Sequence, residues 1–310
     1  MKNFVDDPNL PHRAAGVILG EKYAARFHAA LADIGVTPIY LPDNSCVSPG
    51  LSGHADLSVF HCGGNEVFIA PYLAGSDFAD RLERAGCKVS AADTEQGSAY
   101  PKDCALNACV VGKHLLCNPD VTAREVLSRF GNKRVIGFRQ GYARCTVCVV
   151  DENSIITADA GIAAAAEGRG LDVLRIQAGF FELPGYSYGF IGGSCFKLSR
   201  TELAFTGTID RHPDRGAIIV FLHDHGVEAW ISAVSSRYLS NRNAARSFFR
   251  PCCVSIARFL YRTSFCARLD LPLQPRAGTH CQGGCISASC SDCCGQAPPE
   301  AHAYRRRFST

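Results

Sequence analysis

The chain has 310 residues, of which 47% are hydrophobic and 20% are charged, and its formal net charge at pH 7 is +3. This composition agrees with a globular body. No uninterrupted apolar run comes near the roughly 18–20 residues that span a bilayer, so we expect no membrane-spanning helix and no membrane partner. The first residues, MKNFVDDPNLPHR, lack the basic and then apolar order of a secretory signal, so the sequence predicts a cytoplasmic protein.

Seventeen cysteines would indicate disulfide bonds in a small secreted protein, but this sequence shows no export signal. Nine of the cysteines lie before residue 236, and most of these stand inside apolar runs. Free cysteine in such a run behaves as a small buried hydrophobic residue. We therefore expect packing, rather than disulfide formation, to explain most of the cysteines in this part of the chain.

Five segments of helical character end in a glycine that an apolar strand follows at once. In chain order the glycines are Gly35, Gly86, Gly131, Gly170 and Gly226. Glycine is favoured there because it adopts the left-handed conformation that ends a helix at little cost. Five spaced copies of one device predict an internal repeat.

Two short apolar runs around a polar turn follow each of the first four helix–strand steps. Runs of this kind predict half-buried β-hairpins. The four hairpins are expected within residues 55–71, 104–119, 145–159 and 194–210. Each unit then consists of a helix, a strand and a hairpin over roughly 40–50 residues, a spacing typical of propellers and solenoids.

The order of these elements predicts an α/β fold, a β/α propeller of about five helix–strand–hairpin repeats within residues 10–235. An early strand around residues 15–19 is expected to close the ring by pairing with the last unit. The fifth unit has a helix and a strand, VEAWISAV, but no hairpin follows, so the last repeat is expected to be incomplete. A generic α/β domain whose helices end in glycine is the alternative, and the fourfold recurrence of the same order favours the propeller.

The tail, residues 236–310, differs in composition from the body. It contains 11 arginines, no lysine and three acidic residues, for a net charge of +8, together with eight of the 17 cysteines. Three interpretations stay open: an appended zinc or disulfide module, a basic tail for nucleic acid, and a disordered or aberrant segment from out-of-frame translation. The missing hairpin and the change from lysine to arginine favour the third.

The cysteines of the tail offer soft ligands for zinc, but their spacing is not that of a known zinc module. The candidates are His280, Cys281, Cys285, Cys290, Cys293 and Cys294. Cys290 and Cys293 alone have the tight C-x2-C spacing, so we expect no metal site and no cofactor. Three consecutive arginines, 305–307, could contact phosphates nonspecifically, and no specific nucleic-acid partner is expected.

The segments that lead into the hairpins carry the polar residues of interest, because ligands of a ring meet the strand ends that face its axis. We call them the pre-hairpin segments. The candidate catalytic residues are Cys145, His54, Asp56 and Asp103, and the candidate substrate-binding residues are Asn107, Asp159, Tyr188, Gly192 and Gly193. The last three belong to the sequence GYSYGFIGG, which matches no phosphate-binding loop but places backbone close to a ligand or a neighbouring chain.

Most of these residues also have a purely structural explanation. Asp159 precedes a helix and would cap it. His54 and Asp56 share one face of an extended segment but also fit an ordinary turn, and Asp103 fits a turn after a proline. Cys145 opens an apolar strand, where core packing is the commoner role.

Three segments carry a resemblance to known proteins: YPKDCALNACVVGKHLLCNP, QGYARCTVCVVDENSIITADAGI and LPGYSYGFIGG. They resemble a bacterial family of unknown function, mostly from Firmicutes, over about residues 10–235. More broadly, a ring of helix–strand–hairpin units resembles the pentein, or β/α-propeller, superfamily. That superfamily includes deiminases, dimethylarginine hydrolases and amidinotransferases, which act on guanidino groups, and a non-catalytic ribosome anti-association factor.

The resemblance implies cysteine catalysis, in which a thiolate attacks the guanidinium carbon with the help of a histidine and of carboxylates. In this sequence His54 would serve as the base, and Asp56, Asp103 and Asp159 would supply the carboxylates. The superfamily's nucleophile stands in the last unit, near the C-terminus, where this chain departs from the pattern. Cys145 and Cys195 are the remaining candidates for that role.

Two functions therefore stay open, and with them the question of whether the chain is an enzyme. The first is a thiol-dependent hydrolase or transferase that acts on a guanidino or amide small molecule. The second is a non-catalytic pentein-like protein that binds a ligand or partner through its channel and the GYSYGFIGG loop. A reactive thiol of low pKa would distinguish the first from the second. The sequence leaves the oligomeric state open.

Overall fold

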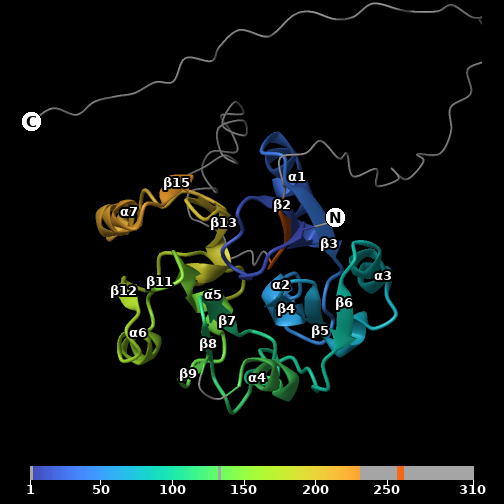
Figure 1. Ribbon diagram of the computed structural model, residues 1–310. Helices are drawn as coiled ribbons and strands as arrows, with labels where there is room; N and C mark the ends of the chain where they lie inside the picture. The colour runs from blue at the N-terminus through green and yellow to red at the C-terminus, as the bar shows by residue number, and fades with distance from the viewer. Residues whose placement is uncertain (1–2, 132–133, 231–256, 262–310) are drawn as a thin grey trace, which may run out of the picture. The chain divides into compact units, whose positions relative to one another are not determined.

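The computed structural model describes residues 3–131, 134–230 and 257–261. All of these residues belong to one compact unit, residues 1–265. The unit is of mixed α/β type and contains five small β-sheets. In Figure 1 the sheets follow one another in chain order around the short helices α2 (Ala55–Ser58) and α5 (Ala143–Thr146). Among the described residues, no helix is long and apolar enough to cross a membrane.

Four of the sheets are built alike. In each, two consecutive strands form an antiparallel hairpin, a helix follows, and a third strand pairs parallel to the second. The four sets are β4 (Val59–Gly63), β5 (Glu66–Ile69), α3 (Asp77–Arg84) and β6 (Lys88–Ala91); β7 (Cys109–Val111), β8 (His114–Cys117), α4 (Arg124–Phe130) and β9 (Val135–Gly137); β10 (Cys148–Val149), β11 (Ser154–Thr157), α6 (Ala160–Glu167) and β12 (Asp172–Arg175); and β13 (Cys195–Ser199), β14 (Glu202–Phe205), α7 (Arg215–Asp224) and β15 (Glu228–Trp230). The four predicted hairpins are thus present.

The fifth sheet has the strand order β1-β16-β2-β3 and combines the two ends of the compact unit. Its strands and helix are β1 (Asn3–Phe4), β2 (Ala14–Gly20), α1 (Ala24–Asp33), β3 (Thr37–Leu41) and β16 (Ala257–Tyr261). Strand β2 pairs parallel to β3, and β16 pairs antiparallel to β2. The early strand expected around residues 15–19 therefore pairs with a strand from beyond residue 236.

This pairing corrects the expectation that the last unit lacks its antiparallel strand. Strand β16 plays that part, but residues 231–256 separate it from β15, so no local hairpin pattern announces it. The remainder of the tail, with its proposed zinc, nucleic-acid and aberrant-translation interpretations, lies outside the described residues.

Glycine ends the helix in all five predicted places. The φ angles of Gly35, Gly86, Gly131, Gly170 and Gly226 lie between 66° and 97°, a region that residues with a Cβ atom enter only at a cost. The N-terminus of α3 is also specified locally, because the Ser76 hydroxyl accepts a hydrogen bond from the Ala79 amide at 3.2 Å and caps the helix. Local sequence thus fixes both boundaries of this helix.

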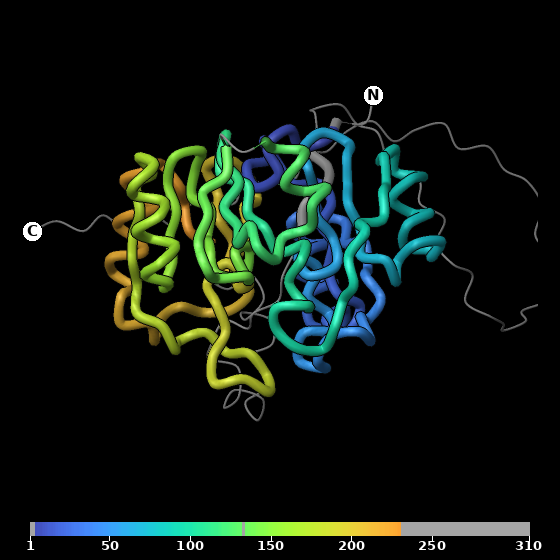
Figure 2. Tube along the Cα trace, turned by 90° about the horizontal axis from the view of Figure 1, so that it is seen from below, coloured from blue at the N-terminus to red at the C-terminus, as the bar shows by residue number. Residues whose placement is uncertain are grey.

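The hydrophobic core consists of several apolar clusters that lie against the sheets. Between α7 and the strands next to it, Ile156, Ile218 and Leu222 are all at most 1% exposed and pack in one apolar cluster. In Figure 1 the longer helices α3, α6 and α7 lie on the periphery, away from α2 and α5. Figure 2 shows the yellow loop around residues 183–190 projecting beyond the ends of the sheets. The pre-hairpin segments are therefore surrounded by packed sheets, and this loop extends from one end.

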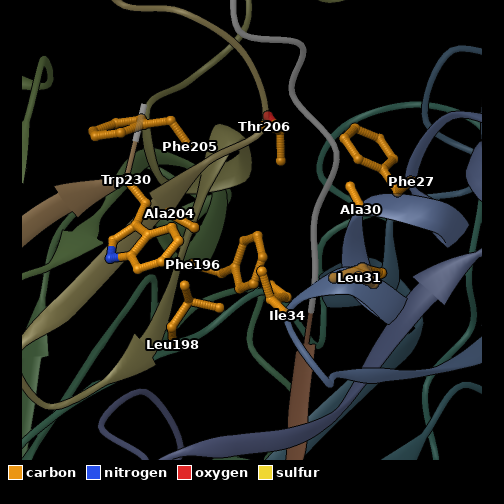
Figure 3. A pocket seen from close by; sticks show the side chains of 10 residues that line it. All are labelled: Phe27, Ala30, Leu31, Ile34, Phe196, Leu198, Ala204, Phe205, Thr206 and Trp230. Carbon is orange, nitrogen blue, oxygen red and sulfur yellow. The ribbon is translucent and has the colours of Figure 1, made fainter. Parts of the chain in front are cut away.

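A narrow apolar hollow lies between α1 and the sheet of β13, β14 and β15 (Figure 3). Phe27 and Leu31 line it from α1, and Phe196, Leu198 and Trp230 line it from the sheet. The described residues that line it are apolar apart from Thr206 and include no carboxylate, so this hollow offers packing rather than chemistry. The titratable groups gather elsewhere.

Candidate active site

Buried polar side chains stand on the pre-hairpin segments. His54 is 1% exposed, Asp56 3%, Asp103 2% and Asn107 1%. Carboxylates and amides are seldom buried this deeply without a partner or a function. His54 and Asp56 lie at α2 before β4, and Cys145 lies on α5 before β10, near the centre of Figure 1.

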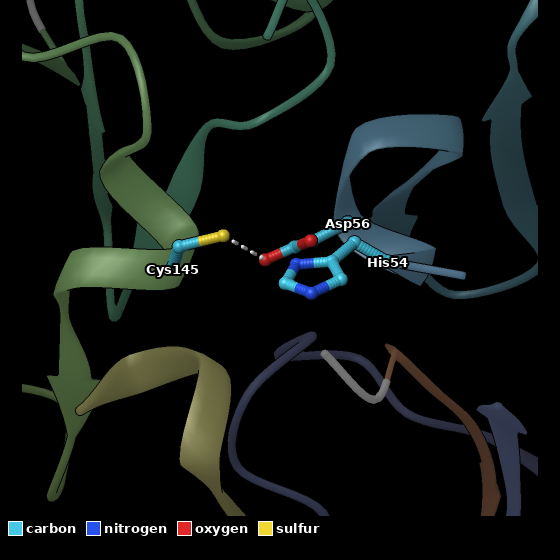
Figure 4. Close-up of side chains that lie close together, drawn as sticks. All are labelled: His54, Asp56 and Cys145. Carbon is cyan, nitrogen blue, oxygen red and sulfur yellow. Dashed lines mark hydrogen bonds between the residues drawn. The ribbon is translucent and has the colours of Figure 1, made fainter. Parts of the chain in front are cut away.

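Three of the predicted catalytic residues come together. The Cys145 thiol donates a hydrogen bond of 3.0 Å to Asp56 Oδ2, although the two residues are 89 positions apart. Side-chain atoms of His54, Asp56 and Cys145 all lie within 4.8 Å of one another. Figure 4 shows His54 and Asp56 on α2 and the segment before it, with Cys145 facing them from α5. A thiol, a carboxylate and an imidazole are thus in reach of one reacting atom.

The same three side chains are the group among the described residues that could hold a metal ion. Imidazole, carboxylate and thiolate are all ligands of zinc. In the structure the thiol proton occupies the path between Cys145 and Asp56, so a metal would have to replace that proton. The arrangement therefore suits proton transfer without a metal as well as it suits metal binding.

Asn107 connects the pre-hairpin segments to one another. Its Nδ2 donates hydrogen bonds to the Cys145 sulfur and to the Asp56 carbonyl oxygen, each with a length of 3.3 Å. Its Oδ1 accepts from the backbone amides of Arg144 at 2.8 Å and Cys145 at 3.2 Å. The protein itself uses these donor and acceptor positions, so the structure gives Asn107 a positioning role, and its predicted contact with substrate stays a prediction.

Arg144 places a positive charge behind the thiol. Its guanidinium donates to the carbonyl oxygens of Gly192 at 3.0 Å and Val147 at 3.4 Å. Burial opposes the charged guanidinium, but the neighbouring Cys109, Cys195 and Asp56 outweigh this effect, so the pKa of Arg144 is raised. The guanidinium therefore stays charged beside the carboxylate of Asp56 and favours a negative charge on nearby sulfur.

Sequence reasoning missed Arg144 as part of the site. The available signal was its position directly before Cys145 in GYARC, which places the two side chains on one short helix.

The sequence could not predict the close approach of Gly192 to this helix. A Cβ at Gly192 would lie 2.5 Å from the carbonyl oxygen of Arg144 and 2.7 Å from that of Cys145. Glycine is required there because the two pre-hairpin segments touch through their backbones.

Asp103 stands apart from the Cys145 group and pairs with a tyrosine. The Tyr142 hydroxyl donates to Asp103 Oδ2 at 2.5 Å. Burial raises the pKa of Asp103, and the hydrogen bond from Tyr142 partly offsets this effect. Tyr142 itself was not among the predicted site residues, and it forms part of the wall described next.

A pocket of about 250 Å³ opens onto His54 and Cys145. Its remaining walls come from Leu51, Tyr142, Leu183, Tyr186, Ser187, Tyr188 and Phe190. The loop with the sequence GYSYGFIGG therefore lies over the candidate catalytic group, and the predicted binding residue Tyr188 lines the pocket. Gly192 and Gly193 are buried in the short 3-10 helix that follows and do not line it.

Two other candidates lie away from the pocket lining. Asp159 Oδ1 accepts a hydrogen bond from the Ile162 amide at 2.8 Å and caps α6, in agreement with its structural explanation. Cys195 is 4% exposed, and its sulfur lies 4.0 Å from the Gly192 carbonyl oxygen. Of the two candidate nucleophiles, Cys145 is therefore the one that a ligand in the pocket would meet.

The remaining cysteines near the core are poor nucleophiles. Burial raises the pKa of Cys104 to about 12 and that of Cys109 to about 12. Burial also raises the pKa of Cys62 to about 12 and that of Cys117 to about 11. Thiols of this kind are almost entirely protonated at neutral pH and react slowly with electrophiles.

Solved structures with similarity to this chain include two amidinotransferases. One, from Microseira wollei in the saxitoxin biosynthetic pathway, is 14% identical with a TM-score of 0.48, and the match covers 76% of this chain and 93% of that chain. The other, the inosamine-phosphate amidinotransferase of Streptomyces griseus, is 13% identical with a TM-score of 0.49, over 86% of this chain and 99% of that chain. DDAH from Pseudomonas aeruginosa is 12% identical with a TM-score of 0.43, over 73% and 94%.

Similarities at these identities say nothing about the reaction of this chain. A search of the curated proteins gives no significant match. One family model matches residues 18–238, which is more than half of the chain. The membership inferred from the sequence is thereby confirmed, and the chain belongs to DUF6873, a family of unknown function.

Proposed function

We propose that this protein is a thiol-dependent hydrolase or transferase that acts on the trigonal carbon of a guanidino or amide small molecule, with Cys145 as the nucleophile. One observation carries the proposal: the Cys145 thiol is hydrogen-bonded to Asp56, lies within 4.8 Å of His54 and lines a pocket. Nucleophilic cysteines need a neighbouring base and access to the substrate.

Each residue has a role in this proposal. His54 accepts the thiol proton as Cys145 sulfur forms a bond to the substrate carbon, and Asp56 orients the thiol and stabilises the resulting imidazolium. His54 then returns the proton to the leaving amine. Water or a second amine next attacks the same carbon, loses a proton to His54 and expels the Cys145 thiolate, which takes that proton back from His54. The positive charge of Arg144 stabilises the thiolate, and the Asn107 amide donates a hydrogen bond to its sulfur. The carboxylates of Asp56 and Asp103 favour a cationic head group on the substrate.

A finer description of the fold belongs to the same proposal. We infer that the five sheets form a closed β/α propeller of the pentein kind, with the pre-hairpin segments at its axis. The common strand order of four sheets and the pairing of β2 with β16 support it. Closure would account for the convergence of side chains that lie 89 positions apart.

Turnover of guanidino and amidino compounds tests the function. We expect the wild-type protein to release ammonia or an amine from at least one compound of a panel, and Cys145→Ser to lose about 10³-fold or more of that rate. Cys195→Ser is the matched control, since it changes a buried thiol outside the pocket lining, and it should stay within about threefold of wild type. Undiminished turnover by Cys145→Ser would exclude Cys145 as the nucleophile.

A non-catalytic role in binding a ligand or partner is the alternative. The exposure of Tyr186 at 44% and Tyr188 at 43% favours it, because exposed aromatic side chains are common at binding surfaces. In that case Cys145 would show no greater reactivity than the other thiols, and Tyr188→Ala would weaken binding without any effect on a reaction.

A further inference from the structure

Away from Cys145 and His54, the described residues that line the pocket carry no formal charge. They have aliphatic, aromatic and hydroxyl side chains. Neither lysine nor arginine, and neither aspartate nor glutamate, occurs among the described residues that line it: Leu51, His54, Tyr142, Cys145, Leu183, Tyr186, Ser187, Tyr188 and Phe190. The part of a ligand that lies away from the thiol is thus surrounded by neutral groups.

The aromatic rings of this wall are arranged for contact with a flat or apolar group. The rings of Tyr188 and Phe190 stand edge to face with centroids 6.1 Å apart, and those of Tyr142 and Phe190 are tilted at 6.3 Å. The Tyr186 and Ser48 hydroxyls are hydrogen-bonded to each other, which ties the loop to the segment before α2. Rings of this kind bind apolar and aromatic groups, and their faces attract cations.

Two carboxylates lie close to the pocket: Asp56 and Asp103 are bonded to the lining residues Cys145 and Tyr142 respectively. The cations near the pocket already have protein partners. Lys22 donates to the Pro49 carbonyl oxygen and the Ser52 hydroxyl. Arg144 donates to backbone carbonyls and lines, with Asp56, a separate small hollow. A carboxylate in the pocket would lose part of its hydration without gaining a basic partner, which disfavours its binding.

We propose that the ligands of this pocket are guanidino or amidino compounds whose tail is an uncharged alkyl or aryl group, and that compounds with a carboxylate on the tail are rejected. The inference rests on the proposed function for the place of the head group beside Cys145. The neutral aromatic wall and the position of Arg144 carry the choice of tail.

A matched pair of ligands tests the tail. Benzylguanidine and its 4-carboxy derivative differ by one carboxylate, and their dissociation constants are measured by calorimetry at pH 7.5. Protection of Cys145 from iodoacetamide, read by peptide mapping, reports occupancy of the pocket. We expect benzylguanidine to protect Cys145 and the carboxylated compound to bind at least about 10-fold more weakly.

A charge introduced into the wall should reverse this preference. Tyr188→Arg places a cation on a side chain that is 43% exposed, so folding should tolerate it, and the carboxylated compound should then bind at least about 10-fold more tightly than it binds wild type. Val220→Arg is the control, because Val220 is 58% exposed on α7 and outside the pocket lining. It should leave both affinities unchanged.

The outcomes separate the two claims. Equal protection of Cys145 by both compounds would overturn the inference about the tail and leave the proposed function standing. The absence of protection by either compound, with Cys145 still labelled selectively, would also overturn the inference while the reactive thiol remained. Loss of selective labelling itself would overturn the proposed function.

Discussion

Cys145 is surrounded by groups that act on it in different ways. Asp56 accepts a hydrogen bond from its thiol, Asn107 Nδ2 donates to its sulfur, and the Arg144 guanidinium supplies a positive charge. The donor and the cation both favour the thiolate over the thiol. Arg144 also acts on Cys109, but burial still raises the pKa of that thiol to about 12, as it does for Cys104. Cys145 differs from both in its hydrogen bond to Asp56, its proximity to His54 and its place in the pocket lining.

Replacement of Arg144 tests the electrostatic part of this account. Arg144→Gln removes the cation, so the pKa of the Cys145 thiol should rise by about one unit and its alkylation at pH 7 should slow about 10-fold. The measurement is the rate of iodoacetamide modification of Cys145 as a function of pH, whose midpoint should shift to higher pH. Arg144→Lys keeps the charge and should stay close to wild type. An identical pH profile for Arg144→Gln and wild type would contradict the proposed role.

At the residue scale the sequence predicted part of the site. His54, Asp56 and Cys145 were named because polar residues before a hairpin face the centre of such a fold. Their hydrogen bond, however, depends on the packing of two segments 89 positions apart. Tyr142 and Arg144 precede Cys145 in the same pre-hairpin segment but were given no role, because their contacts with Asp103 and Gly192 depend on tertiary packing.

The N-terminal segment before β2 packs against the sheets and contains a half-buried carboxylate, that of Asp7. Leu10 is 2% exposed, and Asn9 Nδ2 donates to the Val110 carbonyl oxygen at 2.8 Å. Burial raises the pKa of Asp7 from 3.8 to about 6, although the Asn9 amide and Arg200 act in the opposite direction. The ionised carboxylate is thus less stable in the folded protein than in the unfolded chain.

This shift predicts a pH dependence of stability. The folded state keeps the Asp7 proton up to about pH 6, and the unfolded chain releases it near pH 3.8, so stability falls as the pH rises between these values. Asp7→Asn should therefore raise the free energy of unfolding at pH 7 by about 1–3 kcal/mol and change it little at pH 3.5. Urea unfolding at both pH values measures this, with the exposed neighbour Asp6→Asn as the control. A similar change at both pH values would rule out titration of Asp7 as the cause.

Strand β16 is the element that the sequence did not reveal. The five helices that end in glycine and the four hairpins could be predicted from local patterns, because each involves residues that are neighbours in the sequence. The pairing of β16 with β2 joins residues from opposite ends of the compact unit, for example Ala257 with Ile18. Local periodicity does not predict such a contact, because the two strands lie far apart in the sequence.

A proline in β16 tests whether this strand supports the fold. Because β16 lies between β1 and β2, proline at Leu260 would remove a backbone donor from the sheet and restrict the chain. Leu260→Pro should lower the free energy of unfolding by about 2 kcal/mol or more, as measured in urea, whereas Leu260→Val should have a small effect. Equal stabilities of the two variants would show that β16 contributes little.

The whole molecule brings the pre-hairpin segments of separate sheets to one place. Four sheets of the same construction each deliver a short segment toward the centre, and the loop around residues 183–190 covers the resulting pocket. Sequence patterns predicted the hairpins of these sheets, and they placed candidate substrate-binding residues in the loop. They could not predict that the pocket wall is neutral and aromatic, because that depends on which of the loop side chains face inward.

The reactivity of Cys145 tests the central claim most directly. The folded protein is treated briefly with iodoacetamide at pH 7, and the modification of each cysteine is followed over time by peptide mass spectrometry. The account predicts modification of Cys145 at least about 10-fold faster than that of Cys62, Cys104, Cys109 and Cys117, whose raised pKa values keep them protonated. Modification of Cys145 no faster than these buried thiols would contradict a nucleophilic role and leave ligand binding as the function of the pocket.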